Sequence, residues 1–196
     1  SQTWSFGKQM LYAKGYIYVA GNDGIYRINT QNEYECILGE NAFTGAFFST
    51  GDKVYFVKYA CDFSEDAYLY QYDSTANVAT ALCPSGFYGQ IVGADGDKVY
   101  FLESNEEEGW GNLLIVYNLE TSETSVLAEE VGEAYFWNGT VLYTGCAGDI
   151  SPVKIYSMDS QGNTTLLTEH GSQNLYVDRE NAFYIAYTMA DAALWN

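Results

Sequence analysis

A short phrase that recurs five times constrains the fold of this chain more than any other feature. It places a tyrosine after a turn, as in Gly51-Asp52-Lys53-Val54-Tyr55-Phe56 and Gly96-Asp97-Lys98-Val99-Tyr100-Phe101. The recurring tyrosines, Tyr18, Tyr55, Tyr100, Tyr143 and Tyr184, are spaced by 37, 45, 43 and 41 residues. A period of about 40–50 residues is typical of propeller blades. We expect the tyrosines to fill the space between neighbouring sheets, because large aromatic rings suit face-to-face sheet packing.

A second phrase follows each of the first four tyrosines and ends in aspartate or asparagine, as in Leu69-Tyr70-Gln71-Tyr72-Asp73. A leucine then closes each unit, after steps of 12, 12, 12 and 11 residues; these leucines are Leu38, Leu82, Leu127 and Leu167. One further apolar segment precedes each tyrosine phrase, so each unit holds four strands, which we name A to D from inner to outer. Nineteen Tyr, nineteen Gly and two Pro, without sustained helical periodicity, favour an all-β fold.

The sequence therefore predicts one domain over residues 1–196, a five-bladed β-propeller with four antiparallel strands in each blade. The predicted blades cover residues 10–39, 45–83, 90–128, 133–168 and 174–196. The last blade stops at Trp195-Asn196, inside its third strand. Residues Thr3–Phe6 alternate polar and apolar side chains as a strand does. We expect this N-terminal strand to complete the last blade and close the ring.

The two phrases together resemble uncharacterised secreted propeller repeats of gut Firmicutes, which are similar to TolB-like propellers and to the YWTD propellers of low-density-lipoprotein receptors. The chain departs from these patterns in places, since it has no Tyr-Trp-Thr-Asp string and no Trp-Asp at the end of strand C, as WD40 blades have. The resemblance covers the whole chain. It implies a binding or scaffolding domain outside the cell or on the surface of a bacterium, and it brings no catalytic residue to any position of this sequence.

Charge and cysteine usage limit the classes of partner. Twenty-six Asp and Glu against eight Lys and Arg give a net charge of −18, which argues against nucleic acid and anionic membranes. No apolar run reaches the ~18 residues of a membrane span. The four cysteines, Cys36, Cys61, Cys83 and Cys146, lack a C-x-x-C spacing, so zinc is not expected and their pairing stays open. Asp95-Gly96-Asp97 and Asn22-Asp23-Gly24 fit hairpin turns better than a calcium loop, and we expect no metal and no cofactor.

The segments between strands B and C are the candidate binding site. The step from the first phrase to the second varies from 8 to 15 residues, whereas the other connections keep nearly constant lengths. These segments are acidic and carry aromatic residues, as functional loops on a rigid scaffold do. The candidate residues are Asp62, Phe63, Glu65, Asp66, Glu106, Glu107, Glu108 and Trp110. The D–A connections, with Glu129, Glu130 and Glu133, are expected on the same side. Such a surface suits a cationic peptide or a sugar, although a merely solvated acidic rim explains it too.

Three hypotheses for function remain open. The first is a non-catalytic propeller that binds a protein or glycan through its acidic loops. The second is a five-bladed glycoside hydrolase, which needs a pair of carboxylates. Only Asp178 is acidic among the inner-strand positions, which are Tyr12, Ser49, Ala94, Trp137 and Asp178, and the only histidine, His170, has no marked partner. The third is a purely structural domain within a larger surface protein.

Overall fold

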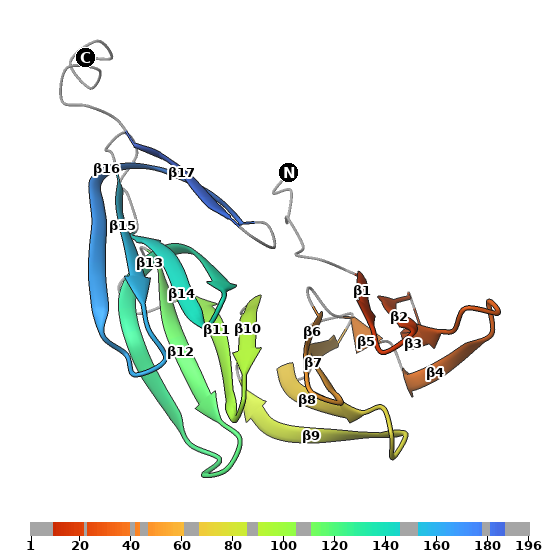
Figure 1. Cartoon of the computed structure of the whole chain (residues 1–196). Helices are drawn as coiled ribbons and strands as arrows, with labels where there is room; N and C mark the ends of the chain where they lie inside the picture. The colour runs from red at the N-terminus through yellow and green to blue at the C-terminus, as the bar shows by residue number, and fades with distance from the viewer. Residues whose placement is uncertain are drawn as a thin grey trace. The chain divides into compact units, whose positions relative to one another are not determined.

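The computed structural model describes residues 10–21, 23–39, 42–43, 47–60, 67–85, 90–104, 111–145, 153–177 and 181–186. Over these ranges the regular structure consists of strands, numbered β1 to β17, and the described residues contain no helix (Figure 1). The predicted all-β class is confirmed. The predicted closing strand and the end of the last blade, residues 3–6 and 194–196, lie outside the described residues. The five-blade ring is therefore still a prediction.

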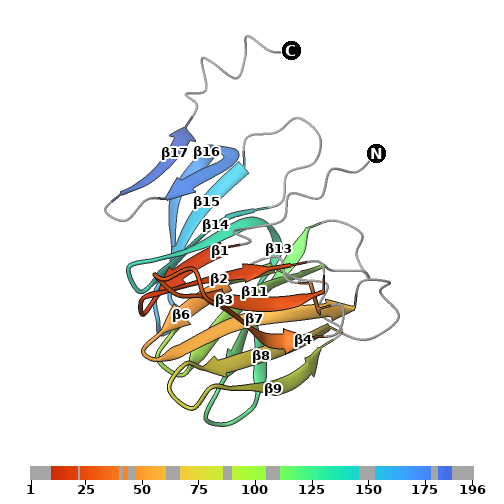
Figure 2. The same cartoon turned by 90° about the vertical axis from the view of Figure 1, so that its right-hand side faces the viewer.

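The chain divides into two compact units, the first made of residues 1–99 and 118–123 and the second of residues 100–117 and 124–196. In the first unit, β1 (Met10–Ala13), β2 (Tyr16–Ala20), β3 (Gly24–Ile28) and β4 (Tyr34–Gly39) form an antiparallel sheet in chain order (Figure 2). We call it the first sheet. This sheet matches the four strands that the sequence predicts for one repeat.

The second sheet of the first unit repeats this order. It contains β6 (Phe47–Thr50), β7 (Lys53–Ala60), β8 (Ala67–Asp73) and β9 (Val78–Ser85), each paired antiparallel with the next. The short β5 (Ala42–Phe43) also pairs with β7, beyond the stretch that β6 covers. Strands β5 and β6 thus line one edge of β7 in succession and together take the place of strand A.

The remaining strands follow one another in an eight-stranded sheet. They are β10 (Gln90–Asp95), β11 (Lys98–Ser104), β12 (Asn112–Asn118), β13 (Thr124–Trp137), β14 (Thr140–Gly145), β15 (Val153–Met158), β16 (Thr164–Val177) and β17 (Ala182–Ala186). The first half of β13 pairs with β12 and its second half pairs with β14, and β16 does the same with β15 and β17. The D–A connections that the sequence suggested at these two places are therefore continuous strands, which act first as strand D and then as strand A.

The turns follow the residue types that the sequence shows. Lys14-Gly15 and Asn138-Gly139 both have positive φ at the two central positions of their A–B hairpins, as type I′ turns require. The corresponding turns at Gly51 and Gly96 place glycine, with φ of 56° and 57°, at the first central position. These hairpins confirm the predicted turn between strands A and B.

The Asp or Asn that ends each second phrase caps the turn between strands C and D. The Oδ1 atom of Asp73 accepts hydrogen bonds from the backbone N–H groups of Thr75 and Ala76, both at 2.9 Å. The side chains of Asn29, Asn118 and Asp159 cap their own turns in the same way. The hydrogen bond from Lys53, together with these backbone donors, lowers the pKa of Asp73 to about 2. The repeated Asp/Asn thus has a local structural cause, the satisfaction of turn amides.

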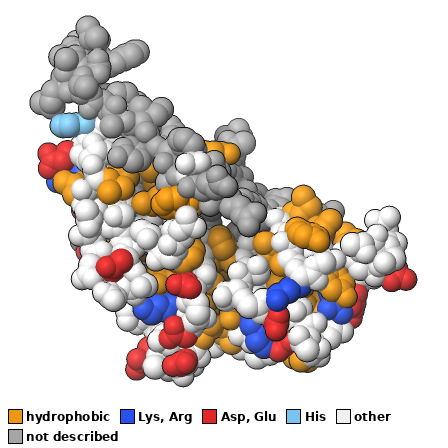
Figure 3. All heavy atoms as spheres, viewed as in Figure 1, with side chains coloured by type: hydrophobic (Ala, Val, Ile, Leu, Met, Phe, Trp, Pro, Cys, Tyr) orange, Lys and Arg blue, Asp and Glu red, His pale blue; other side chains and the backbone are white. Residues whose placement is uncertain are grey.

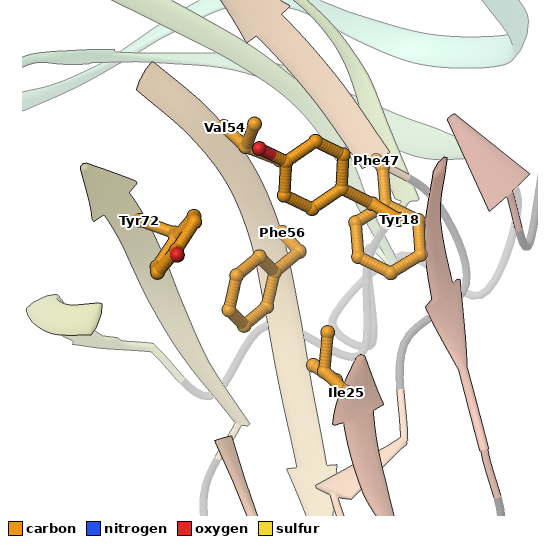
Figure 4. Close-up of a cluster of buried hydrophobic side chains, with 6 residues drawn as sticks. All are labelled: Tyr18, Ile25, Phe47, Val54, Phe56 and Tyr72. Atoms are coloured by element: carbon orange, nitrogen blue, oxygen red, sulfur yellow. The ribbon is translucent and has the colours of Figure 1, made fainter. Parts of the chain in front are cut away.

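A hydrophobic core cluster of the first unit lies between the first and second sheets. Tyr18 and Ile25 of the first sheet meet Phe47, Phe56 and Tyr72 of the second, and these side chains are at most 2% exposed. Figure 4 shows the aromatic rings from both sheets turned toward one another, with Val54 beside them. The expectation that recurring tyrosines fill the space between sheets is confirmed for Tyr18.

The fourth recurring tyrosine occupies a different position. After its hairpin turn, Tyr18 is the third residue of β2, whereas in β14 the third residue is Leu142 and Tyr143 is the fourth. Leu142 pairs across the sheet with Tyr135, and Tyr143 pairs with Ala134. Since successive strand residues alternate faces, Tyr143 points to the face opposite to that of Leu142. Its ring stacks on Tyr156 at 5.0 Å, as Phe56 stacks on Tyr70 at 5.7 Å.

An arginine joins the two sheets of the first unit at the edge of this core. The guanidinium of Arg27 lies 4.8 Å from the ring centroid of Tyr16 and 5.6 Å from that of Tyr72. Its Nη2 atom is 2.7 Å from Glu35 Oε2, and Glu35 Oε1 accepts a hydrogen bond from Asn77 in the turn between β8 and β9. The hydrogen bonds from Asn77 and Arg27 lower the pKa of Glu35. This charged cluster is accounted for by sheet packing and needs no ligand.

Removing the hydroxyl of Tyr18 is expected to leave the protein as stable or to stabilise it by up to about 1 kcal/mol, because a buried polar atom without a partner costs free energy. The side chain is fully buried, and its hydroxyl has no hydrogen-bond partner among the described residues. Urea unfolding of Tyr18→Phe measures the effect. The matched control is Tyr55→Phe, which is expected to lose stability because the Tyr55 hydroxyl donates to Gln71 Oε1 at 3.3 Å. A clear loss in Tyr18→Phe would show that its hydroxyl has a partner.

Candidate functional site

The eight residues of the candidate binding site lie outside the described residues. They belong to segments 61–66 and 105–110, so the structure neither brings them together nor separates them. The structure does describe the strands that carry these segments and several polar groups at the same strand ends.

The first anchor is the hairpin of β7 and β8. These strands pair in uninterrupted register from Lys53 opposite Asp73 to Lys58 opposite Tyr68. Segment 61–66 connects the strand ends beyond Lys58, and the capped turn of Asp73 lies at the other end of the same hairpin. The buried side chains of Val54, Phe56 and Leu69 hold the hairpin in the core. A loop on such a support starts from fixed ends, as binding loops on rigid scaffolds do.

The second anchor lies directly after segment 105–110. Gly111 has a φ of 82°, a conformation that favours glycine. The Nδ2 atom of Asn112 donates hydrogen bonds to the carbonyl oxygens of Val131 and Gly132, both at 3.1 Å. These bonds attach Asn112, which is two residues after Trp110 in the sequence, to β13. Sequence reasoning missed Asn112, whose type alone carries no sign of this role.

Two glycines mark the places where β13 and β16 pass from the outer to the inner position. A Cβ atom on Gly132 would lie 2.7 Å from Thr144 Oγ1, and one on Gly171 would lie 2.4 Å from Ile155 Cδ1. Thr144 is fully buried, and its Oγ1 accepts a hydrogen bond from the backbone N–H of Glu133 at 3.0 Å. In the sequence, Gly132 and Gly171 lie five and four residues after Leu127 and Leu167, the leucines that close their repeats. This spacing is the signal that could have identified the two glycines.

The carboxylates of β13 divide into two kinds. Glu129 and Glu130 are exposed, and Glu130 has a φ of 53° at an irregularity of the strand. Glu133 is half-buried, and its Oε2 atom accepts a hydrogen bond from the backbone N–H of Leu175 at 3.4 Å. Burial raises the pKa of Tyr135, and the negative charge of Glu133 adds to that shift. Glu129 and Glu130 therefore expose their negative charge to solvent, whereas Glu133 links β13 to β16 through this hydrogen bond.

The residues considered for catalysis do not form a described site. Asp178 lies outside the described residues. His170 lies within β16, where its backbone N–H donates to Thr168 Oγ1 at 3.1 Å. Its Nδ1 atom is buried and has no partner among the described residues. In the described part of the chain, no group of three or more His, Cys, Asp or Glu side chains is arranged to hold a metal ion.

Cys36 is a free and exposed thiol on β4. The side chains of the other three cysteines lie outside the described residues. No helix long and apolar enough to cross a membrane occurs in the ranges that the structure describes.

Solved structures with a similar fold are β-propeller proteins. An oligogalacturonate lyase in complex with manganese matches with a TM-score of 0.64 and 13% identity, over 85% of this chain and 54% of that chain. TolB from Acinetobacter baumannii matches with a TM-score of 0.57 and 15% identity, over 79% of this chain and 41% of that one. The β-propeller domain of the Trilobed protease from Pyrococcus furiosus, described as having an open velcro topology, matches with a TM-score of 0.50 and 14% identity. The match covers 72% of this chain and 47% of that one.

No protein-family model and no curated protein sequence matches the chain. The chain spans about half the length of the first two structures named above. At these levels of identity the likeness shows the fold alone. The repeats of this chain thus have the β-propeller type of fold, in agreement with the TolB-like resemblance of their sequence.

Proposed function

We propose that this chain is a non-catalytic binding domain of five propeller repeats, which holds a protein or glycan partner through the acidic segments between its B and C strands. The observation that carries the proposal is the contrast within each hairpin. The β7–β8 hairpin and its capped turn at Asp73 are held by core packing and hydrogen bonds. The length of the repeats varies mainly at the opposite ends of these strands, in the segments between strands B and C. A location outside the cell or on its surface belongs to the proposal and rests on the resemblance to secreted repeats.

The charge of segment 105–110 supports a cationic partner group. Glu106, Glu107 and Glu108 are consecutive, so their mutual repulsion opposes a compact conformation unless a positive charge lies near. Glu129 and Glu130 on β13 add exposed negative charge in the same unit. A lysine- or arginine-containing peptide would relieve this repulsion, and its binding would weaken as salt increases.

The aromatic residue of the same segment supports a contact of high energy. Trp110 lies between Gly109 and Gly111 in the sequence, and the next residue, Asn112, is bound to β13 through two hydrogen bonds. Tryptophan is favoured where a few residues carry most of the binding energy, and its ring stacks on sugars and on cations.

Replacement of Trp110 by alanine is expected to weaken binding at least about tenfold, the scale of an interface residue that carries energy. The ligand comes from a glycan and peptide array, with calcium present and absent, and affinity is then measured by calorimetry. Glu107→Ala is expected to weaken binding of a basic peptide at low salt more than at high salt.

The matched control is Glu120→Ala. Glu120 is an exposed glutamate in the capped turn of β12, at the end opposite to Trp110. The Glu120→Ala variant is expected to bind the ligand with the affinity of the original chain. An array without any ligand would contradict the proposal, and so would unchanged affinity in Trp110→Ala and Glu107→Ala beside a loss in Glu120→Ala.

A further inference from the structure

A charged pair lies at the boundary between the first and second sheets. Arg27 of β3 and Glu35 of β4 are directly opposite one another in the first sheet. The Nε and Nη2 atoms of Arg27 lie 2.8 Å and 2.7 Å from Glu35 Oε2, so one carboxylate oxygen receives two donors of the guanidinium. Figure 3 shows acidic and basic side chains beside one another over the strands of the first unit. We call Arg27 and Glu35 the boundary pair.

The positive member of the boundary pair is mostly buried. Only 12% of the Arg27 side chain is exposed, and its guanidinium lies over the rings of Tyr16 and Tyr72, one from each sheet. Its Nη1 atom donates a hydrogen bond to the carbonyl oxygen of Ser74 at 3.4 Å. Burial raises the pKa of Tyr72 to about 12, so this phenol is neutral below that range. Among the described residues, Glu35 is therefore the counter-ion of this guanidinium.

The negative member of the boundary pair is bonded to both sheets. Glu35 Oε2 accepts from Arg27, and Glu35 Oε1 accepts a hydrogen bond at 2.7 Å from Asn77 Nδ2, in the turn between β8 and β9. The hydroxyl of Tyr72 donates to Asn77 Oδ1 at 2.6 Å, which leaves the Nδ2 group of the amide for Glu35. An ionised carboxylate accepts on both oxygens, whereas a protonated one carries a donor on one of them. Because both neighbours donate, this arrangement requires the ionised form of Glu35.

An exposed ion pair between the same two sheets provides a comparison. Lys14 and Asp52 lie 2.8 Å apart and join the A–B turns of the two sheets, but their side chains are 55% and 61% exposed. Water screens such a pair, so its loss costs little. Loss of the charge of Glu35 would instead leave the mostly buried guanidinium of Arg27 without its counter-ion, which is strongly unfavourable. Acid therefore acts on the contact between the two sheets mainly through Glu35.

We propose that the boundary pair is an acid-sensitive latch: when Glu35 takes up a proton, the first sheet loosens from the second while the second unit stays folded. The hydrogen bonds from Asn77 and Arg27 lower the pKa of Glu35 from its ordinary value of 4.5. A carboxylate of this kind contributes its full stability above pH 4.5 and loses it as the pH falls through the lowered pKa. Lys53 and the turn amides keep Asp73 of the second sheet ionised down to about pH 2. The inference does not depend on the proposed binding site.

Hydrogen exchange of the full chain tests the proposal between about pH 7 and about pH 3, with protection factors read by mass spectrometry of peptides. We expect β3 and β4 to lose protection in the acid part of this range at least about tenfold more than β14 and β15 of the second unit. The reason is that every member of the latch belongs to the first unit. At neutral pH both sets of strands are expected to stay protected.

Two variants separate the latch from general acid unfolding. Glu35→Gln keeps the size of the side chain but removes its charge, so β3 and β4 are expected to exchange at least about tenfold faster already at neutral pH. Arg27→Met combined with Glu35→Gln removes both charges. Because an apolar side chain needs no counter-ion, this double variant is expected to recover the protection of β3 and β4 at neutral pH and to keep it in acid.

The matched control is Asp52→Asn, which removes the exposed ion pair with Lys14 between the same two sheets. Its hydrogen exchange is expected to follow that of the original chain at every pH. An effect as large as that of Glu35→Gln would mean that any ion pair between these sheets holds them together, and the boundary pair would have no special role.

Three further results would overturn the proposal. In the original chain, β3 and β4 could lose protection at the same pH as the second unit, which would indicate general acid unfolding. Glu35→Gln could keep the protection of the original chain at neutral pH. The double variant could still lose protection of β3 and β4 in acid. The double variant also decides the case in which Glu35→Gln does not fold, because a latch requires that the double variant folds and exchanges independently of pH.

Discussion

Substitution of Phe56 by alanine is expected to lower the free energy of unfolding of the first unit by about 3–5 kcal/mol, the range for a large aromatic residue removed from a core. Phe56 is fully buried on β7. Its ring stacks on Tyr70 with centroids 5.7 Å apart, and the ring of Phe47 lies 5.8 Å away. The neighbours belong to paired strands, so they have little freedom to move into the cavity. Most of the lost contact would stay lost.

Urea unfolding followed by far-ultraviolet circular dichroism measures this loss. Val78→Ala serves as the control, because Val78 is about half exposed and its truncation is expected to change stability by no more than about 0.5 kcal/mol. If Phe56→Ala unfolded at the same urea concentration as Val78→Ala, the packing between the first and second sheets would not be the main source of stability in this unit.

Substitution of Gly171 by alanine is the second change with a large expected effect, a loss of about 1–3 kcal/mol from overpacking. The new Cβ would lie 2.4 Å from Ile155 Cδ1, 2.5 Å from Ile155 Cγ1 and 3.1 Å from the Val153 carbonyl oxygen. Ile155 is fully buried and packs with Leu142 and Leu175. Because Ile155 is enclosed by these residues, its side chain or the strand must shift to admit the new methyl group.

The control for this prediction is Gly145→Ala. A Cβ on Gly145 meets only the Lys154 carbonyl oxygen, at the ordinary distance of 3.8 Å. Thermal unfolding of both variants, followed by circular dichroism, is expected to show a clearly lower midpoint for Gly171→Ala and little change for Gly145→Ala. Equal unfolding midpoints for the two variants would mean that Gly171 of β16 and Ile155 of β15 are packed less tightly than the structure shows.

Part of the candidate site was visible in the sequence and part was not. Repeat counting located segments 61–66 and 105–110 and their charges, because insertion length and residue type are properties of the chain itself. The hydrogen bonds of Asn112 to β13 were not visible, since they join residues 19 and 20 positions apart. Glu129, Glu130 and Glu133 were assigned together to a connection, but they lie on a strand in which Glu133 alone accepts a bond from Leu175.

The sequence by itself determined the local features of this protein. Asn138-Gly139 specifies its tight turn, and Asp73 and its counterparts cap theirs, because both features depend on neighbouring residues. Only the tertiary structure decided which residues share a face and where one strand serves two neighbours. Tyr143 is offset by one position from the other tyrosines, and a shift of one residue turns a side chain to the opposite face. The continuity of β13 and β16 likewise depends on partners on either side of Gly132 and Gly171, which no local pattern records.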